Sequence, residues 1–350
     1  MKSGKSLTEL AAEVQRQQAT RRDYIADVSS LDFVHTTRPM AKMTLDTSDA
    51  YLGITEVAHQ QLAGFANVPN QYYNRILTEY PDLWARTLNT LVPVQHGTRR
   101  MVRTLDGNMR AFLSDRYRRL DNAELLESVL PVFQQFPGLR VESCEITERR
   151  LYLKAVYPRV EAEVKKGDVV QAGIVISNSE VGSGSYNIQQ MVFRLVCLNG
   201  LITGSAMRKT HLGRRAEEDG EMDWSDETRQ ADDRALFLKT RDTVKSALNG
   251  LSFTKTVEQL RIAAQDKMEA SPVKAVEVLA NTIGLAEREK DSVLRYLIEG
   301  GDLSRYGMSN AVTRMAQDVE SYDRSTDLEV LGHRIITLPR SDWGLIAQAA

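Results

Sequence analysis

Residues 173–204 read GIVISNSEVGSGSYNIQQMVFRLVCLNGLITG and determine the fold class. The run Gly173–Ile176 is apolar and β-branched, which favours a buried strand. A polar loop, Asn178–Ser185, follows, and a second apolar run ends near Asn199. Five glycines in these 32 residues mean that the backbone turns tightly or approaches a group with which a Cβ atom would clash. The stretch therefore predicts two strands joined by a tight loop.

The second apolar run, Tyr186–Leu198, fits two periodicities. Its alternation from Met191 to Cys197 is that of a strand, whereas the spacing of Ile188, Met191 and Leu195 also fits one face of a helix. We interpret the run as a strand.

Upstream of this stretch, the pattern is that of β-hairpins. The segments RRMVRTL and MRAFLS flank Asp106-Gly107-Asn108, a strong hairpin turn signal. The segments LRVESCEIT and RLYLKAVYP then alternate around Glu148-Arg149. We therefore expect a mostly antiparallel, partly mixed sheet over residues 90–205.

Helical patterns lie on both sides of this sheet. Residues 6–24 carry a capping box, and residues 55–79 look like a helical hairpin. Residues after 226 are helical, with caps at Ser271-Pro272 and Gly284. The expected fold is α+β, with three regions: a helical region over 1–90, a β-rich core over 91–210, and an acidic helical region over 226–350. The charged linker at 211–227 is the expected boundary.

The hairpin at 55–79 has two interpretations. The small and apolar residues around Asn67 are spaced as in a helix-turn-helix, which would read duplex DNA. The second helix, however, offers a single positive charge, Arg75, whereas major-groove readers are usually more basic. We favour a plain helical hairpin.

Composition is that of an ordinary globular protein: 350 residues, 42% hydrophobic and 26% charged. No window is apolar enough for a transmembrane helix, and the N-terminus is too polar for a signal peptide. The two cysteines, Cys144 and Cys197, form no disulfide framework. We expect a cytoplasmic protein with reduced, structural cysteines and no membrane partner.

Charge is distributed unevenly along the chain. Residues 1–215 carry 28 Lys and Arg against 22 Asp and Glu, a net of +6. Residues 216–350 carry 17 against 25, a net of −8, so that the two parts sum to −2. This asymmetry points weakly to an anionic partner for the first part.

Arginine is concentrated in residues 99–119, RRMVRTLDGNMRAFLSDRYRR, where no lysine occurs and the acidic residues are Asp106 and Asp115. Guanidinium groups bind phosphate in a bidentate manner and stack on bases, and Tyr117 would add a further stacking surface. We expect contacts to single-stranded nucleic acid from Arg99, Arg100, Arg103, Arg110, Arg116, Tyr117, Arg118 and Arg119. The alternative is a solvated sheet edge whose arginines pair with the acidic helices.

Further basic residues would extend the same groove. They are Arg149, Arg150 and Lys154 on the next hairpin, with Arg194, Arg208, Lys209, Arg214 and Arg215 beyond it. In the polar loop, Asn178, Gly182 and Gly184 would allow close approach of the backbone to a ligand. The alternative for this loop is a purely architectural connection between strands.

Catalytic and metal-binding signatures are weak. The five histidines are scattered without zinc spacing, and the loop Gly182–Ser185 lacks the lysine of a phosphate-binding P-loop. We therefore predict no catalytic residue, no metal and no cofactor. An active site around Asn178–Ser185 and Asn199 is kept as a second alternative.

Three motifs in this order resemble the phage- and plasmid-borne family catalogued as domain of unknown function 932. They are Ser114–Arg118, Asn178–Gly184 and Arg194–Gly200, and the resemblance extends over roughly residues 50 to 345. It implies a setting in DNA replication, recombination or defence, and supplies no reaction. The succession of basic hairpins and helices is also distantly analogous to Rad52-like single-strand annealing proteins, at the level of organisation.

These observations favour a non-enzymatic protein that binds single-stranded nucleic acid, with DNA as the expected ligand, and anneals strands as a homo-oligomer. The alternative is a self-associating or partner-binding protein whose basic hairpin docks on acidic helices of the same or another chain.

Overall fold

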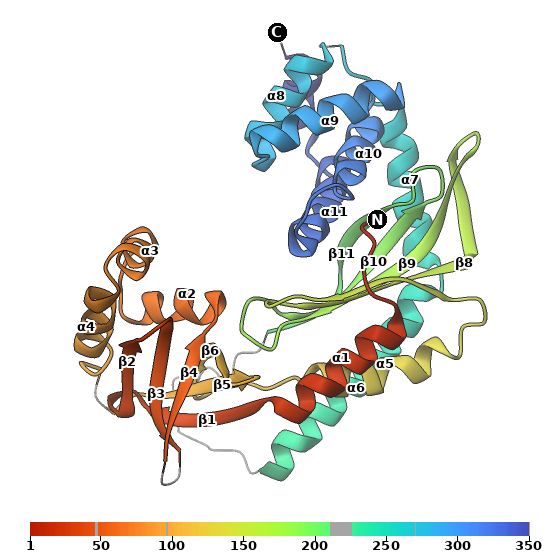
Figure 1. Ribbon diagram of the computed structural model, residues 1–350. Coiled ribbons are helices and arrows are strands. Elements are labelled where there is room, and N and C mark those ends of the chain that lie inside the picture. The colour runs from red at the N-terminus through yellow and green to blue at the C-terminus, as the bar shows by residue number, and fades with distance from the viewer. Residues whose placement is uncertain (46–47, 96, 211–225, 270, 350) are drawn as a thin grey trace, which may run out of the picture.

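In the part of the chain that the structure describes, the fold is α+β, built on two β-sheets and the helices packed against them (Figure 1). The computed structural model describes residues 1–45, 48–95, 97–210, 226–269 and 271–349. The expected boundary at 211–227 lies almost entirely outside the described residues. None of the described helices is long and apolar enough to cross a membrane.

The first sheet has six strands in the order β1-β5-β6-β4-β3-β2. Its pairs are antiparallel except for the short parallel pair of β4 with β6. The strands are β1 (Arg22–Asp27), β2 (Leu31–His35), β3 (Pro39–Leu45), β4 (Ser48–Ile54), β5 (Arg99–Leu105) and β6 (Asn108–Ser114); the 3₁₀ turn η1 (Val28–Ser30) joins β1 to β2. Helices α2 (Glu56–Phe65), α3 (Asn70–Glu79) and α4 (Pro81–Leu91) cover one face and share an apolar core with it.

Local signals in this part behave as predicted. Asp106 and Gly107 have positive φ values of 51° and 73°, the geometry of a type I′ hairpin turn. Asn67, between α2 and α3, also has a positive φ of 53°, so the predicted helical hairpin at 55–79 is present.

The expected helical region over 1–90 differs from the structure between residues 22 and 54, which form the four strands β1–β4. Two of these strands complete the sheet by pairing with distant partners, β1 with β5 and β4 with β6. Short-range patterning does not reveal such pairs, because β4 is exposed along its first half. Consequently, the single sheet expected over 90–205 is divided between two sheets.

The second sheet has five antiparallel strands in the order β11-β10-β9-β8-β7. They are β7 (Arg140–Ile146), β8 (Leu151–Lys165), β9 (Asp168–Asn178), β10 (Tyr186–Arg194) and β11 (Asn199–Lys209). The opening stretch therefore forms the end of β9, all of β10 and the start of β11. Its ambiguous segment is a strand up to Arg194 and a turn over residues 195–198. One face packs against α1 (Leu7–Thr20), α5 (Asn122–Phe133) and α6 (Asp226–Leu248) around an apolar core.

The remaining helices follow this second sheet. Helix α7 (Leu251–Gln265) packs on its long β8–β9 hairpin. The last five helices form a core of their own: α8 (Pro272–Ile283), α9 (Glu287–Gly300), α10 (Arg305–Met315), α11 (Tyr322–Ile336) and α12 (Arg340–Ala347). The predicted caps are present, since Ser271 caps α8 and Gly284 ends it with a positive φ of 73°.

A partly buried histidine in the first core couples stability to pH. His59 Nδ1 lies 2.8 Å from the Tyr73 hydroxyl oxygen, and the His59 ring packs edge-on against Trp84. Burial lowers the pKa of His59 from 6.5 to about 4, so the ring is neutral in the fold at neutral pH.

We therefore expect the free energy of unfolding to fall as pH drops from about 6.5 to about 4, by at most about 3 kcal/mol from this residue. Above pH 6.5 the contribution is fully present, because neither state then binds the proton. Urea titrations at several pH values should show a shallower slope for His59→Gln than for the native chain. Burial also lowers the pKa of His333, which leaves a residual slope; equal slopes for both proteins would contradict the assignment.

Candidate functional site

The loop Asn178–Ser185, which joins β9 to β10, is where the two sheets meet. The amide nitrogen of the Asn178 side chain donates to the Leu120 carbonyl (2.8 Å) and to Asn122 Oδ1 (2.9 Å). Gly182 has a positive φ of 75°, and a Cβ atom there would lie 2.7 Å from a methyl group of Leu113 in β6. The close approach of the two sheets therefore requires a glycine at this position.

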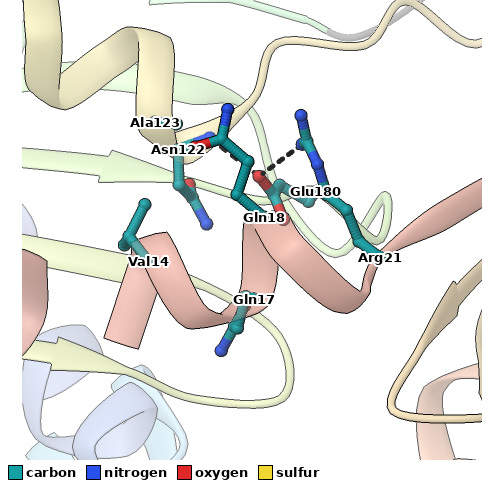
Figure 2. A pocket seen from close by; sticks show the side chains of 7 residues that line it. All are labelled: Val14, Gln17, Gln18, Arg21, Asn122, Ala123 and Glu180. Atoms are coloured by element: carbon teal, nitrogen blue, oxygen red, sulfur yellow. Dashed lines mark hydrogen bonds and ion pairs between the residues drawn. The ribbon is translucent and has the colours of Figure 1, made fainter. Parts of the chain in front are cut away.

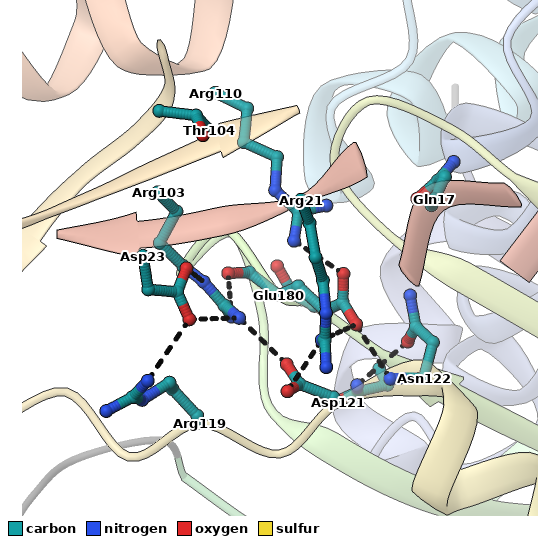
Figure 3. A network of polar contacts seen from close by, with 12 residues as sticks. Gln17, Arg21, Asp23, Arg103, Thr104, Arg110, Arg119, Asp121, Asn122 and Glu180 are labelled. Carbon is teal, nitrogen blue, oxygen red and sulfur yellow. Dashed lines mark hydrogen bonds and ion pairs between the residues drawn. The ribbon is translucent and has the colours of Figure 1, made fainter. Parts of the chain in front are cut away.

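Glu180 anchors this loop in a buried network of charges (Figure 3). Its carboxylate accepts hydrogen bonds from Arg110 Nη2 (2.7 Å) and from the backbone N–H of Asn122 (2.7 Å). Its carbonyl oxygen accepts one from Arg103 Nη1 (2.9 Å). The loop is thus tied to β5, β6 and the start of α5 at once.

Arg103 is the centre of this network. Its side chain is fully buried and binds both carboxylate oxygens of Asp23 in β1, at 2.8 and 3.1 Å. It also donates to Asp121 Oδ1 at 2.8 Å, while Arg21 binds the other oxygen of Asp121 at 2.6 Å. Burial alone would raise the pKa of Asp121, but Arg103 and Arg21 hold it below its usual range. Asp121 is therefore charged at neutral pH.

Within the buried part of the network, formal charges cancel: Arg21, Arg103 and Arg110 face Asp23, Asp121 and Glu180. A small cavity beside it has room for about one water, with a volume of about 10 Å³. Figure 2 shows Arg21 reaching toward Glu180 at its edge. The cavity is too small for a substrate.

Several predicted contact residues are engaged in packing. Arg100 lies over the rings of Phe65 and Phe112, 4.7 and 5.1 Å from their centres. Tyr117 is half-buried, and its hydroxyl donates to the Ser179 carbonyl (2.9 Å). Arg118 pairs with Asp232 (2.5 Å) and with Asp233 in α6. The tyrosine is thus no open stacking surface, and Arg118 makes the pairing with acidic helices that the alternative reading expects.

The predicted basic residues of the second hairpin also make contacts within the protein. Lys154 is fully buried and pairs with Glu329 in α11 at 2.5 Å. Arg149 binds Glu56 and Gln60 in α2, and next to it the Glu148 carboxylate accepts from the N–H of Val57 at the start of that helix. The turn before β8 therefore holds the second sheet against helix α2.

Around the loop, a set of arginines remains in contact with solvent. The Arg150 guanidinium donates to the Ser183 carbonyl at 2.6 and 3.0 Å, Arg208 Nε donates to Ser185 Oγ at 3.1 Å, and the Arg149 carbonyl accepts from Ser179 Oγ at 2.8 Å. Arg116 is exposed beside Tyr117, and Arg119, 54% exposed, reaches Asp23 at 3.4 Å. We call these five the rim arginines: Arg116, Arg119, Arg149, Arg150 and Arg208.

The structure thus separates the predicted residues into two groups. Arg103, Arg110 and Lys154 are buried in ion pairs, which overturns the expectation that they are open to phosphate in this conformation. Gly184 lies against Arg150, whose Nε would be 2.7 Å from a Cβ atom there. Arg99 is exposed at the start of β5, away from these contacts. Arg194 pairs with Asp168, and Arg214 and Arg215 lie outside the described residues.

Sequence reasoning missed the carboxylates of the network, Asp23, Asp121 and Glu180. A signal was present, since Glu180 is an acidic residue within the glycine-bearing loop and Asp121 precedes a helix at its N-cap. The cysteines are both free; burial raises the pKa of Cys144 to about 12. Among the described residues, no group of three or more His, Cys, Asp or Glu side chains is placed to hold a metal ion.

Residues 111–217 match the family described as Domain of unknown function (DUF932). The match begins in β6 and includes the loop Asn178–Ser185 and β7–β11. None of the curated proteins and none of the solved structures matches the chain.

The network makes a specific prediction about stability. Arg103→Met removes the cation shared by Asp23 and Asp121 and leaves one buried negative charge of the network uncompensated, so the free energy of unfolding should fall by about 3–5 kcal/mol. Arg99→Met, on the exposed start of the same strand, is the matched control and should change it by less than about 0.5 kcal/mol. Urea unfolding followed by circular dichroism measures both. Equal midpoints for the two variants would show that the network carries no net stability.

Proposed function

We propose that the protein binds single-stranded nucleic acid, with DNA as the expected ligand, through the rim arginines. The observation that carries this proposal is that the side chains of Arg150 and Arg208 and the backbone of Arg149 contact one short loop, Asn178–Ser185, whose Gly182 backbone is exposed. Guanidinium groups next to accessible backbone offer several donors to the phosphates of one strand.

A flexible strand suits this surface better than a duplex. The rim follows an irregular line over the segment between β6 and α5, the turn before β8 and the end of β11. A single strand can bend along such a line, whereas duplex DNA is stiff over about 150 base pairs. Arg103 and Arg110 support the surface from within, by holding the loop in place.

The biological setting is part of the proposal. The match of residues 111–217 to the DUF932 family, together with the resemblance to phage- and plasmid-borne proteins, supports a role in the DNA metabolism of mobile elements. Annealing of complementary strands by an oligomer would fit that role, and light scattering with and without oligonucleotide measures the oligomeric state directly.

A salt titration tests the binding. Fluorescence anisotropy with a labelled 20-nucleotide oligothymidylate should show a binding constant that falls linearly with salt on a double logarithmic plot. The triple variant Arg116→Ala, Arg149→Ala, Arg208→Ala should reduce the slope by about 2, because each lost phosphate contact on a single strand removes about 0.7.

The matched control carries the same loss of charge elsewhere: Arg86→Ala, Arg288→Ala, Arg340→Ala, at exposed positions of α4, α9 and α12. It should leave the slope within about 0.5 of the native value. Absence of binding by the native chain at low salt, or equal slopes for the two triple variants, would refute binding at the rim.

A second candidate function rests on the ion pairs of Arg118 with Asp232 and Asp233. Pairing of this kind between chains would make the protein a self-associating or partner-binding one. An assembly that dissociates as salt rises, and whose size oligonucleotide does not change, favours this second candidate.

A further inference from the structure

One strand of the second sheet presents a basic and aromatic stripe on the face opposite α1, α5 and α6. Leu151, Leu153 and Ala155 pack in the core with those helices. The alternate positions are Arg150, Tyr152 and Lys154, which lie on the other face because successive side chains of a strand point to opposite sides. Arg150 and Tyr152 lie at the end of this stripe nearest the Asn178–Ser185 loop.

Helix α11 covers this stripe with carboxylates. Asp323 Oδ1 accepts from the Tyr152 hydroxyl at 2.7 Å, and Glu329 Oε2 accepts from Lys154 at 2.5 Å. Asp327 Oδ1 lies 3.9 Å from Arg150 Nη1, at the limit of an ion pair. Each member of the stripe thus faces one acidic group of the first half of α11, which lies against this sheet in Figure 1.

The contact between α11 and the sheet is largely polar in this half. Buried oxygens of Ser325, Thr326, Glu329 and Asn199 have no hydrogen-bond partner among the described residues. The first half of α11 thus meets the sheet partly through polar groups, whereas α8–α12 share an apolar core among themselves.

The two acidic groups next to the rim differ from Glu329 in accessibility. The Asp327 side chain is 56% exposed and that of Arg150 is 34% exposed, whereas Lys154 and Glu329 are fully buried. The inner pair fixes α11 on the sheet, and the outer carboxylates lie where an incoming phosphate would approach Arg150.

Building on the proposed function, we infer that Asp323 and Asp327 of α11 act as an internal competitor of nucleic acid. Asp327 lies beside the Arg150 guanidinium, and Asp323 holds the buried Tyr152 hydroxyl next to it. Their negative charges compete with a phosphate for Arg150 and thereby weaken binding at this end of the rim. The acidic C-terminal helices then regulate the basic surface of the same chain. The contact is intramolecular, so its strength is independent of protein concentration.

The test uses the full chain and near-isosteric substitutions. In Asp323→Asn with Asp327→Asn, the side chains keep their shape and an acceptor oxygen but lose their charge. We expect the dissociation constant for the 20-nucleotide oligothymidylate to fall about fivefold to tenfold at low salt, as expected when two partly exposed negative charges near Arg150 are removed. Asp327→Asn alone changes a mostly exposed side chain and should give part of this gain.

The matched control removes two charges from exposed positions of the same acidic region, Asp291→Asn with Glu299→Gln in α9. It should tighten binding by less than twofold. Adding Arg150→Ala to the Asp323→Asn, Asp327→Asn variant should abolish the gain, since the effect passes through that arginine.

The possible outcomes distinguish a failure of the competitor role from a failure of the proposed nucleic-acid binding. If the native chain binds and the α11 variants bind no more tightly, or if the control variant tightens binding equally, the competitor role of Asp323 and Asp327 is refuted. The nucleic-acid proposal then still stands. Absence of binding by every protein in the series overturns both. A gain in affinity that persists in the variant with Arg150→Ala also refutes the competitor role, because the lost carboxylate charges then act through another group.

Discussion

The arrangement of the two sheets depends on one buried carboxylate, Glu180, in the loop that joins β9 to β10. A carboxylate is costly to bury unless charge and hydrogen bonds compensate it. Arg110 and the N–H of Asn122 bind its oxygens, and the guanidinium of Arg103 binds its carbonyl. Because these partners come from β5, β6 and the start of α5, the requirement to compensate one charge fixes the second sheet against the first.

The same constraint explains why an arginine-rich sequence yields only a partly basic surface. Between residues 99 and 119, Arg103 and Arg110 are needed inside the protein, and Arg118 is held by Asp232 and Asp233. What reaches solvent beside the loop is the remainder, including Arg116 and Arg119. The density of arginine in a sequence therefore overestimates a binding surface whenever carboxylates from other parts of the chain meet it.

Local features could be predicted from the sequence because their causes lie within a few residues. The turn at Asp106-Gly107, the Ser6 capping box and the Gly284 helix stop are each determined by neighbouring atoms. The burial of Arg103 could not be predicted in this way, since its partners Asp23 and Glu180 are 80 and 77 residues distant along the chain. The division into two sheets was missed for the same reason, because β1 and β4 find their partners across the helices α2–α4.

The uneven distribution of charge along the chain acquires a structural meaning from these contacts. The acidic C-terminal region supplies Asp232 and Asp233 to Arg118, and Asp323, Asp327 and Glu329 to the stripe on β8. The two oppositely charged parts of the chain are thus in contact, so their net charges offset each other at close range. A surface balanced in this way binds an anion only to the extent that the anion competes with the carboxylates already present. The accessible ion pairs, rather than the total positive charge, therefore govern the affinity for an anion.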